Sequence, residues 1–249
     1  SDLCGSRTYF SKTENIGYQG YINFSQYLNS HPCNFEEKAK ILPNKLAVIS
    51  KYFKKNKREF FPKLKVTLAP ALNLSTEYKK IKKRNKNLIT LILTGIIEID
   101  QKLINWSLNF VKKNKKTKLE IKFHPILAPD KFDLRIFNNN SIQIKIADKD
   151  ISKLLDRSKI VISTGPTSAI YQAYLKECYL IIPVFDPWDK LNLENCKIPK
   201  SNYVLVNNFK EFRFNLKNMI NNKDRNKLKF TKNNFIYNNC NSDNMKIFQ

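Results

Sequence analysis

The sequence predicts an α/β fold: a doubly wound, Rossmann-like parallel sheet, with a partial second α/β domain before it. From residue 88 onward, apolar runs of strand length alternate with segments in which apolar residues recur at helical spacing, as in repeated βαβ units. The runs are apolar throughout, which is typical of parallel strands buried on both faces. The 249 residues, 42% of them hydrophobic, are enough to bury a core without disulfide bonds.

The region before residue 88 predicts one more strand, helix and strand, over 46–50, 52–60 and 64–68, whereas residues 1–45 show no clear pattern. Proline, charge and missing periodicity coincide after residue 68, which indicates a linker. We therefore expect four parts: an amino-terminal unit over 1–72, a linker over 73–87, a Rossmann-like domain over 88–220, and a helix or tail over 221–249.

The first strand of the main domain is expected over 88–94, where an apolar run is closed by Gly95. A helix follows, because apolar residues recur at helical spacing as far as a lysine-rich stretch that ends at Lys118. The next strand, 119–123, is expected to stop at His124-Pro125, since proline has no N–H to donate to a neighbouring strand.

The same alternation continues to residue 220. Further strands are expected over 141–146, 159–163, 179–184 and 203–206, and helices over 150–157, 169–174 and about 209–220. Between two of these elements lies a turn that is rich in hydroxyl groups, Ser163-Thr164-Gly165-Pro166-Thr167-Ser168. Helices of this length between strands predict right-handed crossovers and a parallel sheet.

Open parallel sheets bind ligands beyond the carboxyl ends of their strands, which directs attention to the residues directly after each strand. These residues are Gly95, His124, Pro125, the turn 163–168 and the segment 185–189. In the turn, a glycine, a proline and the start of a helix would offer free amides and four hydroxyls to a phosphate. The alternative is an ordinary helix start, in which Thr164 or Thr167 only caps the helix. Capping explains one hydroxyl but not four, so the turn favours phosphate binding.

The other polar candidates have competing interpretations. His124, at a strand end, could face the same crevice as the turn or could be a structural histidine, and His31 is expected in a loop. Glu98 and Asp100 are best explained by the favourable position of acids at a helix start. Asp186 follows an apolar strand and could contact a ligand or form a turn.

The charge and the cysteines exclude several function classes. The 45 Lys+Arg against 21 Asp+Glu give a net charge of +24, but only seven of these cations are arginines, the residue that reads phosphates and bases bidentately. We therefore expect no specific nucleic-acid partner. Five widely spaced cysteines and two histidines predict neither a disulfide framework nor a metal site, and fit a reducing cytoplasm. P-loop, dinucleotide and hydrolase-elbow motifs are absent from the sequence.

No apolar run approaches 18 residues, and the sequence starts at Ser1 without a signal peptide or initiator methionine. We expect the chain to begin inside a larger protein.

Three segments in succession resemble the carboxyl-terminal domain of GT-B glycosyltransferases. They are Ile121-Lys122-Phe123-His124-Pro125, the stretch from Ile160 to Ala169, and Tyr179-Leu180-Ile181-Ile182-Pro183. The pattern is most similar to that of bacterial surface and capsule polysaccharide transferases, including sialyl- and polysialyltransferases and CDP-glycerol polymerases, which share a Lys-x-His-Pro motif and a later Ser/Thr pair. The resemblance covers roughly residues 45–206.

The resemblance implies that the chain binds a CMP-, CDP- or UDP-linked sugar donor, transfers the sugar to a glycan or lipid-linked acceptor, and needs no metal or other cofactor. It also implies that residues 1–72 are the remnant of the acceptor-side domain. The residues expected to bind the donor phosphate or nucleotide are Gly95, His124, Pro125, Ser163, Thr164, Gly165, Thr167 and Ser168. Gln172, where many relatives have a glutamate, and Asp186 are possible contacts for the ribose or sugar. The catalytic base is expected in the missing domain.

Two other functions remain open at this point: a nucleotide-sugar 2-epimerase or hydrolase of the same fold, and a basic binder of nucleic acid or anionic surfaces without enzymatic activity. For the transferase, the expected location is the cytoplasm, with possible association with the anionic face of the inner membrane.

Overall fold

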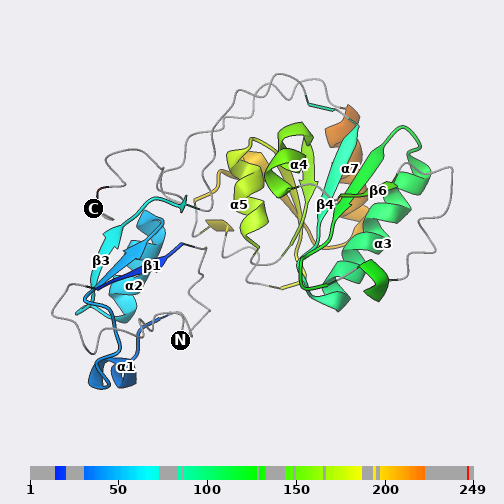
Figure 1. Cartoon of the computed structure of the whole chain (residues 1–249). Coiled ribbons are helices and arrows are strands. Elements are labelled where there is room, and N and C mark those ends of the chain that lie inside the picture. The colour runs from blue at the N-terminus through cyan, green and yellow to red at the C-terminus, as the bar shows by residue number, and fades with distance from the viewer. Residues whose placement is uncertain are drawn as a thin grey trace. The chain divides into compact units, whose positions relative to one another are not determined.

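A computed structural model of the chain describes residues 15–20, 31–72, 84–85, 87–127, 129–132, 144–147, 150–164, 167–186, 193–194, 197–221 and 246. The chain divides into two compact units (Figure 1), built from Ser1–Glu77, Asn195–Lys197 and Lys232–Gln249, and from Tyr78–Glu194 and Ile198–Thr231. The expected tail over 221–249 lies outside the described residues except for two positions.

The first unit contains a parallel sheet in the order β1-β2-β3. Its elements are β1 (Ile16–Gln19), α1 (Asn34–Lys38), β2 (Lys45–Val48), α2 (Lys51–Phe60) and β3 (Lys65–Leu68). The expected strand, helix and strand are confirmed as β2, α2 and β3. Helix α2 begins where the Ser50 hydroxyl accepts a hydrogen bond from the Phe53 amide at 3.1 Å, a standard N-cap.

The second unit contains six parallel strands in the order β6-β5-β4-β7-β8-β9. The strands are β4 (Leu88–Ile92), β5 (Lys118–Lys122), β6 (Ile144–Ile146), β7 (Ile160–Ile162), β8 (Tyr179–Pro183) and β9 (Tyr203–Val206). Numbered along the chain this is the order 3-2-1-4-5-6, in which the winding reverses between β4 and β7. The doubly wound parallel sheet expected from the sequence is thus confirmed.

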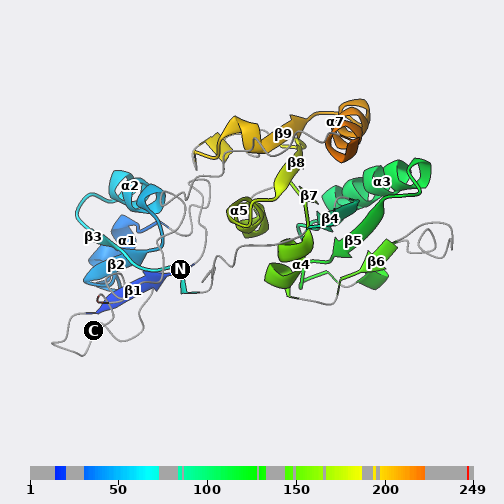
Figure 2. The ribbon, with the colours of Figure 1, turned by 90° about the horizontal axis from the view of Figure 1, so that it is seen from above.

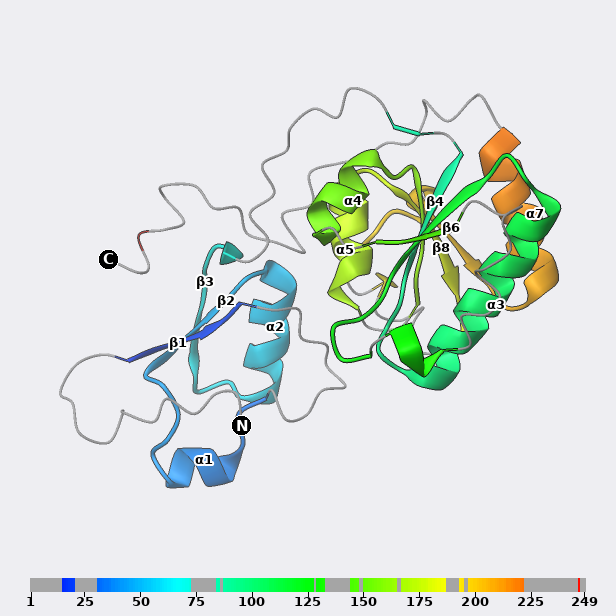
Figure 3. The same ribbon diagram turned by 45° about the vertical axis from the view of Figure 1, so that its right-hand side comes forward.

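Helices cover both faces of this second sheet. They are α3 (Ile97–Lys113), α4 (Ile151–Arg157), α5 (Ser168–Leu175) and α7 (Phe209–Asn221), with short 3-10 helices η3 (Pro129–Lys131) and η5 (Lys200–Asn202). Viewed from above, α3 and α7 lie on one side of the strands and α4 and α5 on the other (Figure 2). A turned view shows the strands running between these two helix layers (Figure 3). The core consists of buried strand residues such as Leu91 and Ile162 together with Leu103 and Phe212 from the helices.

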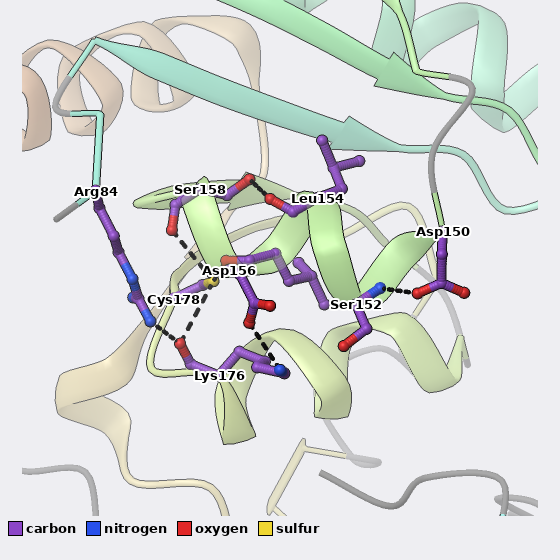
Figure 4. A network of polar contacts seen from close by, with 9 residues as sticks. Arg84, Asp150, Ser152, Leu154, Asp156, Ser158, Lys176 and Cys178 are labelled. Carbon is purple, nitrogen blue, oxygen red and sulfur yellow. Dashed lines mark hydrogen bonds and ion pairs between the residues drawn. The ribbon is translucent and has the colours of Figure 1, made fainter. Parts of the chain in front are cut away.

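A polar network stabilises the end of this sheet at which the strands begin (Figure 4). The Arg84 guanidinium donates hydrogen bonds to the carbonyls of Lys176 and Glu177, just after α5. The Lys176 ammonium pairs with Asp156 of α4 at 2.7 Å, so α4 and α5 are tied together beside Arg84. Burial raises the pKa of the neighbouring Cys178 thiol to about 12, which keeps it protonated and unreactive at neutral pH. The network therefore stabilises the end of the sheet at which the strands begin.

One buried cation makes the stability of the first unit depend on pH. Lys57 of α2 is fully buried, and desolvation lowers its pKa from 10.5 to about 7. Between about pH 7 and 10.5 the unfolded chain binds more protons at this residue than the folded chain does, so stability rises with pH across that window. We expect Lys57→Met to raise the urea midpoint of this unit at pH 7 and to flatten its pH dependence.

The measurement is a urea titration at pH 7 and pH 9.5, followed through the NMR signals of β2. Lys51→Met, at an exposed position of the same helix, is the control and should keep the slope of the parent protein. An unchanged slope in Lys57→Met would show that this ammonium does not titrate in the window.

Candidate functional site

The reversal of strand order brings the carboxyl ends of β4 and β7 together. The two strands pair in register, with Leu91 opposite Ile162, so they end at the same level of the sheet. Strand β5 pairs with the other side of β4, which brings the residues after β5 to the same edge. The segments that follow β4, β7 and β5 begin at Leu93, Ser163 and Phe123. Crevices at such a point are where open α/β sheets bind ligands.

Gly95 and His124 are in direct contact at this edge. Gly95 has a φ of +92°, a left-handed conformation that favours glycine. A Cβ atom added to Gly95 would lie 2.8 Å from Nδ1 of His124 and 3.0 Å from its Cγ. The imidazole therefore packs on the bare backbone of Gly95. These two candidates, which come from neighbouring strands, are brought together by the fold.

The hydrogen bonding of His124 orients its ring. The backbone N–H of Ile126 donates to Nδ1 at 3.3 Å, so in the neutral ring the proton is on Nε2. The carbonyl of His124 accepts from the Leu127 amide at 3.0 Å, which closes a turn around the exposed Pro125. The ring is only partly buried, and Nε2 is the nitrogen through which it can donate to a ligand.

Asp100 is a residue of this site whose importance the sequence analysis missed. Its fully buried carboxylate accepts from the Thr94 amide at 2.7 Å, the Thr94 hydroxyl at 2.9 Å and the Gly95 amide at 2.9 Å. The helix dipole at the start of α3 explains why an acid is favoured here, but not these three hydrogen bonds. A sequence signal does exist, because an acid in the first helical turn after a strand and a glycine can reach back to the loop amides. The Gly95 N–H donates to Asp100, so this amide is already used. What Gly95 offers the site is the room left by its missing side chain.

The first two hydroxyls of the turn are directed into the sheet. Ser163 Oγ donates to the Ile92 carbonyl at 2.9 Å, and the Thr164 hydroxyl donates to the Pro183 carbonyl. Both side chains are buried, and they tie the end of β7 to its two neighbours, β4 and β8. Their hydroxyl protons therefore have structural acceptors, and phosphate binding by these two residues stays a prediction.

Thr167 caps the start of α5, as expected if this hydroxyl serves the helix and not a ligand. Thr167 Oγ1 accepts from the Ala169 amide at 3.3 Å, so its hydroxyl caps the helix. Ser168 is exposed, and the half-buried Gln172 lies four residues further along. That spacing puts Ser168 and Gln172 on one face of α5. Gly165 and Pro166 lie outside the described residues.

Two serines of this turn give opposite expectations. Ser163→Ala removes a buried hydrogen bond and should lower the free energy of unfolding of the second unit by about 1 kcal/mol. Ser168→Ala removes an exposed hydroxyl and should leave stability unchanged while it weakens nucleotide binding. Urea denaturation and calorimetric titration with UDP and CMP measure the two effects. Equal stability losses in both variants would contradict the assignment.

The segment after β8 is held by aromatic packing. The Phe185 ring meets Trp106 of α3 edge-on, with 5.4 Å between ring centroids, and Lys102 Nζ lies 5.5 Å from the Phe185 centroid. Asp186 follows directly and is exposed. This packing fixes the backbone from which Asp186 projects, next to the end of β8. The rest of the expected segment, residues 187–189, lies outside the described residues.

Two further observations concern the described part of the chain. It contains no group of three or more His, Cys, Asp or Glu side chains arranged to hold a metal ion. None of its helices combines the length and apolarity needed to cross a bilayer.

Comparison by sequence finds no match among protein-family models or curated proteins. Comparison by structure does find matches, to proteins with the same α/β, Rossmann-like fold. TarM matches with a TM-score of 0.50 and 16% identity, over 86% of this chain and 45% of TarM. The chain thus spans less than half the length of TarM.

Two more solved structures match at the same level. The pneumococcal O-GlcNAc transferase GtfA, crystallised with UDP and GlcNAc, has a TM-score of 0.50 and 11% identity, over 75% of this chain and 39% of GtfA. A Listeria monocytogenes protein, provisionally assigned as a UDP-N-acetylglucosamine 2-epimerase, has a TM-score of 0.50 and 12% identity, over 79% of this chain and 56% of its own. At these identities the similarity establishes the fold.

Proposed function

We propose that the chain is the donor-binding part of a glycosyltransferase, which moves a sugar or a related unit from a nucleotide-activated donor to a surface polysaccharide or lipid-linked acceptor. The observation that carries this proposal is the imidazole of His124 seated on Gly95, where the strand order reverses. The solved structure of GtfA, which holds UDP and GlcNAc, supports a sugar nucleotide as the ligand of this fold.

The geometry suits charge stabilisation on the leaving group. In the proposed reaction an acceptor hydroxyl attacks the anomeric carbon, the bond from that carbon to the nucleotide phosphate breaks, and negative charge collects on the phosphate. If the donor is a CDP-alditol, the hydroxyl attacks the alditol-bearing phosphorus instead, the bond from that phosphorus to the bridging oxygen breaks, and CMP leaves with the negative charge. Nε2 of His124 and the positive end of the α5 helix dipole would face that charge, an example of electrostatic preorganisation. We propose that this transfer needs no metal, and that the catalytic base comes from the part of the enzyme beyond this chain.

The expected contacts with the rest of the donor remain part of the proposal. Gln172 and Asp186 would contact the ribose or sugar, and Ser168 would contact the phosphate. The net charge of +24 would attract polyphosphate donors and the anionic inner face of the membrane, where we propose the enzyme acts.

The test is a binding and product panel with CMP-, CDP- and UDP-linked sugars. The proposal predicts saturable binding of one nucleotide that survives moderate salt, and release of that nucleotide when an acceptor glycan is added. Weak binding of every nucleotide, together with salt-sensitive binding of DNA, would instead favour the basic binder.

A 2-epimerase is the second candidate, and the Listeria monocytogenes structure favours it. Product analysis separates the two activities, because an epimerase interconverts two free sugars or sugar nucleotides without an acceptor, whereas a transferase forms a new glycosidic bond. We expect the glycosidic product.

A further inference from the structure

The buried carboxylate of Asp100 organises the loop that carries Gly95. Three donors from two consecutive residues converge on it: both amides of Thr94-Gly95 and the Thr94 hydroxyl, at 2.7–2.9 Å. Charge-assisted hydrogen bonds of this length are among the stronger ones in proteins. The carboxylate therefore fixes the backbone just after β4 through direct hydrogen bonds, which an interaction with the helix dipole alone would not do.

The position of this loop sets the position of His124. The imidazole lies against Gly95 so closely that a Cβ on Gly95 would be 2.8 Å from Nδ1. A rotation of the Thr94-Gly95 peptide would move the surface on which the ring packs. Asp100 can thus act on His124 through Gly95.

Glu98 offers a comparison within the same helical turn. Both acids lie in the first turn of α3, but Glu98 is exposed and Asp100 is fully buried. If the helix dipole were the only reason for acids here, the two residues would have similar effects. Asp100, the buried acid of the two, accepts the hydrogen bonds from the Thr94-Gly95 loop, so the two residues differ in a way that the dipole does not explain.

We propose that Asp100 is a positioning residue of the donor site, which holds the Thr94-Gly95 backbone, with Gly95 in its left-handed conformation, so that His124 is seated with Nε2 toward the donor phosphate. This inference rests on the proposed function for the identity of the ligand. The part that concerns the loop and the histidine ring stands on the geometry alone.

The first test is an NMR comparison of Asp100→Asn and Glu98→Gln in the 249-residue chain, without ligand. Asparagine places an NH₂ group where one carboxylate oxygen was, so at least one of the three donors loses its acceptor. We expect Asp100→Asn to shift the Gly95 amide signal and the ring nitrogen signals of His124. Glu98→Gln should leave them as in the parent protein. Identical spectra at Gly95 and His124 in both variants would overturn the proposal.

The second test measures binding of UDP, CMP and CDP by calorimetry. We expect the dissociation constant of the bound nucleotide to rise at least about tenfold in Asp100→Asn, as for loss of a charged hydrogen bond, and to stay unchanged in Glu98→Gln. If the parent chain binds none of UDP, CMP and CDP, the proposed function fails, whereas the NMR comparison still decides the positioning role.

A milder variant guards against misfolding of Asp100→Asn. Thr94→Val removes the hydroxyl donor of the three and keeps both amides, and it also removes the acceptor of the Ile96 amide. Smaller shifts of the same Gly95 and His124 signals would support the proposal, and their absence in a folded Thr94→Val protein would oppose it.

Discussion

Replacing His124 by alanine is expected to lower the proposed sugar transfer by a factor on the order of 10²–10³, as for loss of one oxyanion donor. The physical reason is that Nε2 is the nitrogen left to the ligand, since Nδ1 accepts the Ile126 amide. In the proposed mechanism, the negative charge that develops on the leaving phosphate would lose a fixed donor without the ring. Transfer is measured as nucleotide release with an acceptor glycan, and binding as calorimetric titration with the nucleotide.

Two variants control for indirect effects. His124→Gln keeps a neutral N–H donor of similar reach and should recover part of the activity. Ile126→Ala alters an exposed side chain two residues further on and should keep both transfer and binding. Undiminished transfer in a folded His124→Ala protein would remove this residue from the mechanism.

Gly95→Ala is expected to have the second largest effect. A Cβ there would lie 2.8 Å from Nδ1 of His124, and the φ of +92° is strained for any residue with a side chain. We expect a loss of about 1–3 kcal/mol in the stability of the second unit, because of the backbone strain. We also expect a loss of nucleotide binding similar to that of His124→Ala, because the ring must move away.

A matched control exists in the first unit. A Cβ on Gly17 would lie 2.9 Å from Cγ of Pro43, so Gly17→Ala creates similar crowding in β1. It should weaken the first unit and leave nucleotide binding intact. In a double-variant cycle, Gly95→Ala should cost little further binding once His124 is already alanine. Full additivity of the two losses would mean that Gly95 does not act through the ring.

The fold of the second unit could be predicted because its strands are buried on both faces. The continuous apolar run at 88–92 cannot form an amphipathic element, so it identifies a central strand from the sequence alone. Strand β1 was not predicted, since it has four residues, includes Gly17 and is only partly buried. Its structure depends on pairing with β2, which local patterns do not report.

The candidate site could be predicted in outline only. The rule that ligands bind beyond strand ends selected Gly95, His124 and Ser163, and the structure brings all three to one edge of the sheet. The rule could not say where the Ser163 hydroxyl points, because its acceptor, the Ile92 carbonyl, is set by the register between two strands. Asp100 was underestimated for the same reason, since its partners are defined by how the loop folds back on the helix.

The second sheet has a short edge strand, β6, which limits how the protein can associate. An edge strand exposes backbone N–H and C=O groups that can pair with a strand from another molecule. Strand β6 has three residues, and its central Lys145 is exposed. If two copies approached along β6, their lysines would bring like charges together on a strand too short to set a register. Self-association by strand addition is therefore disfavoured here.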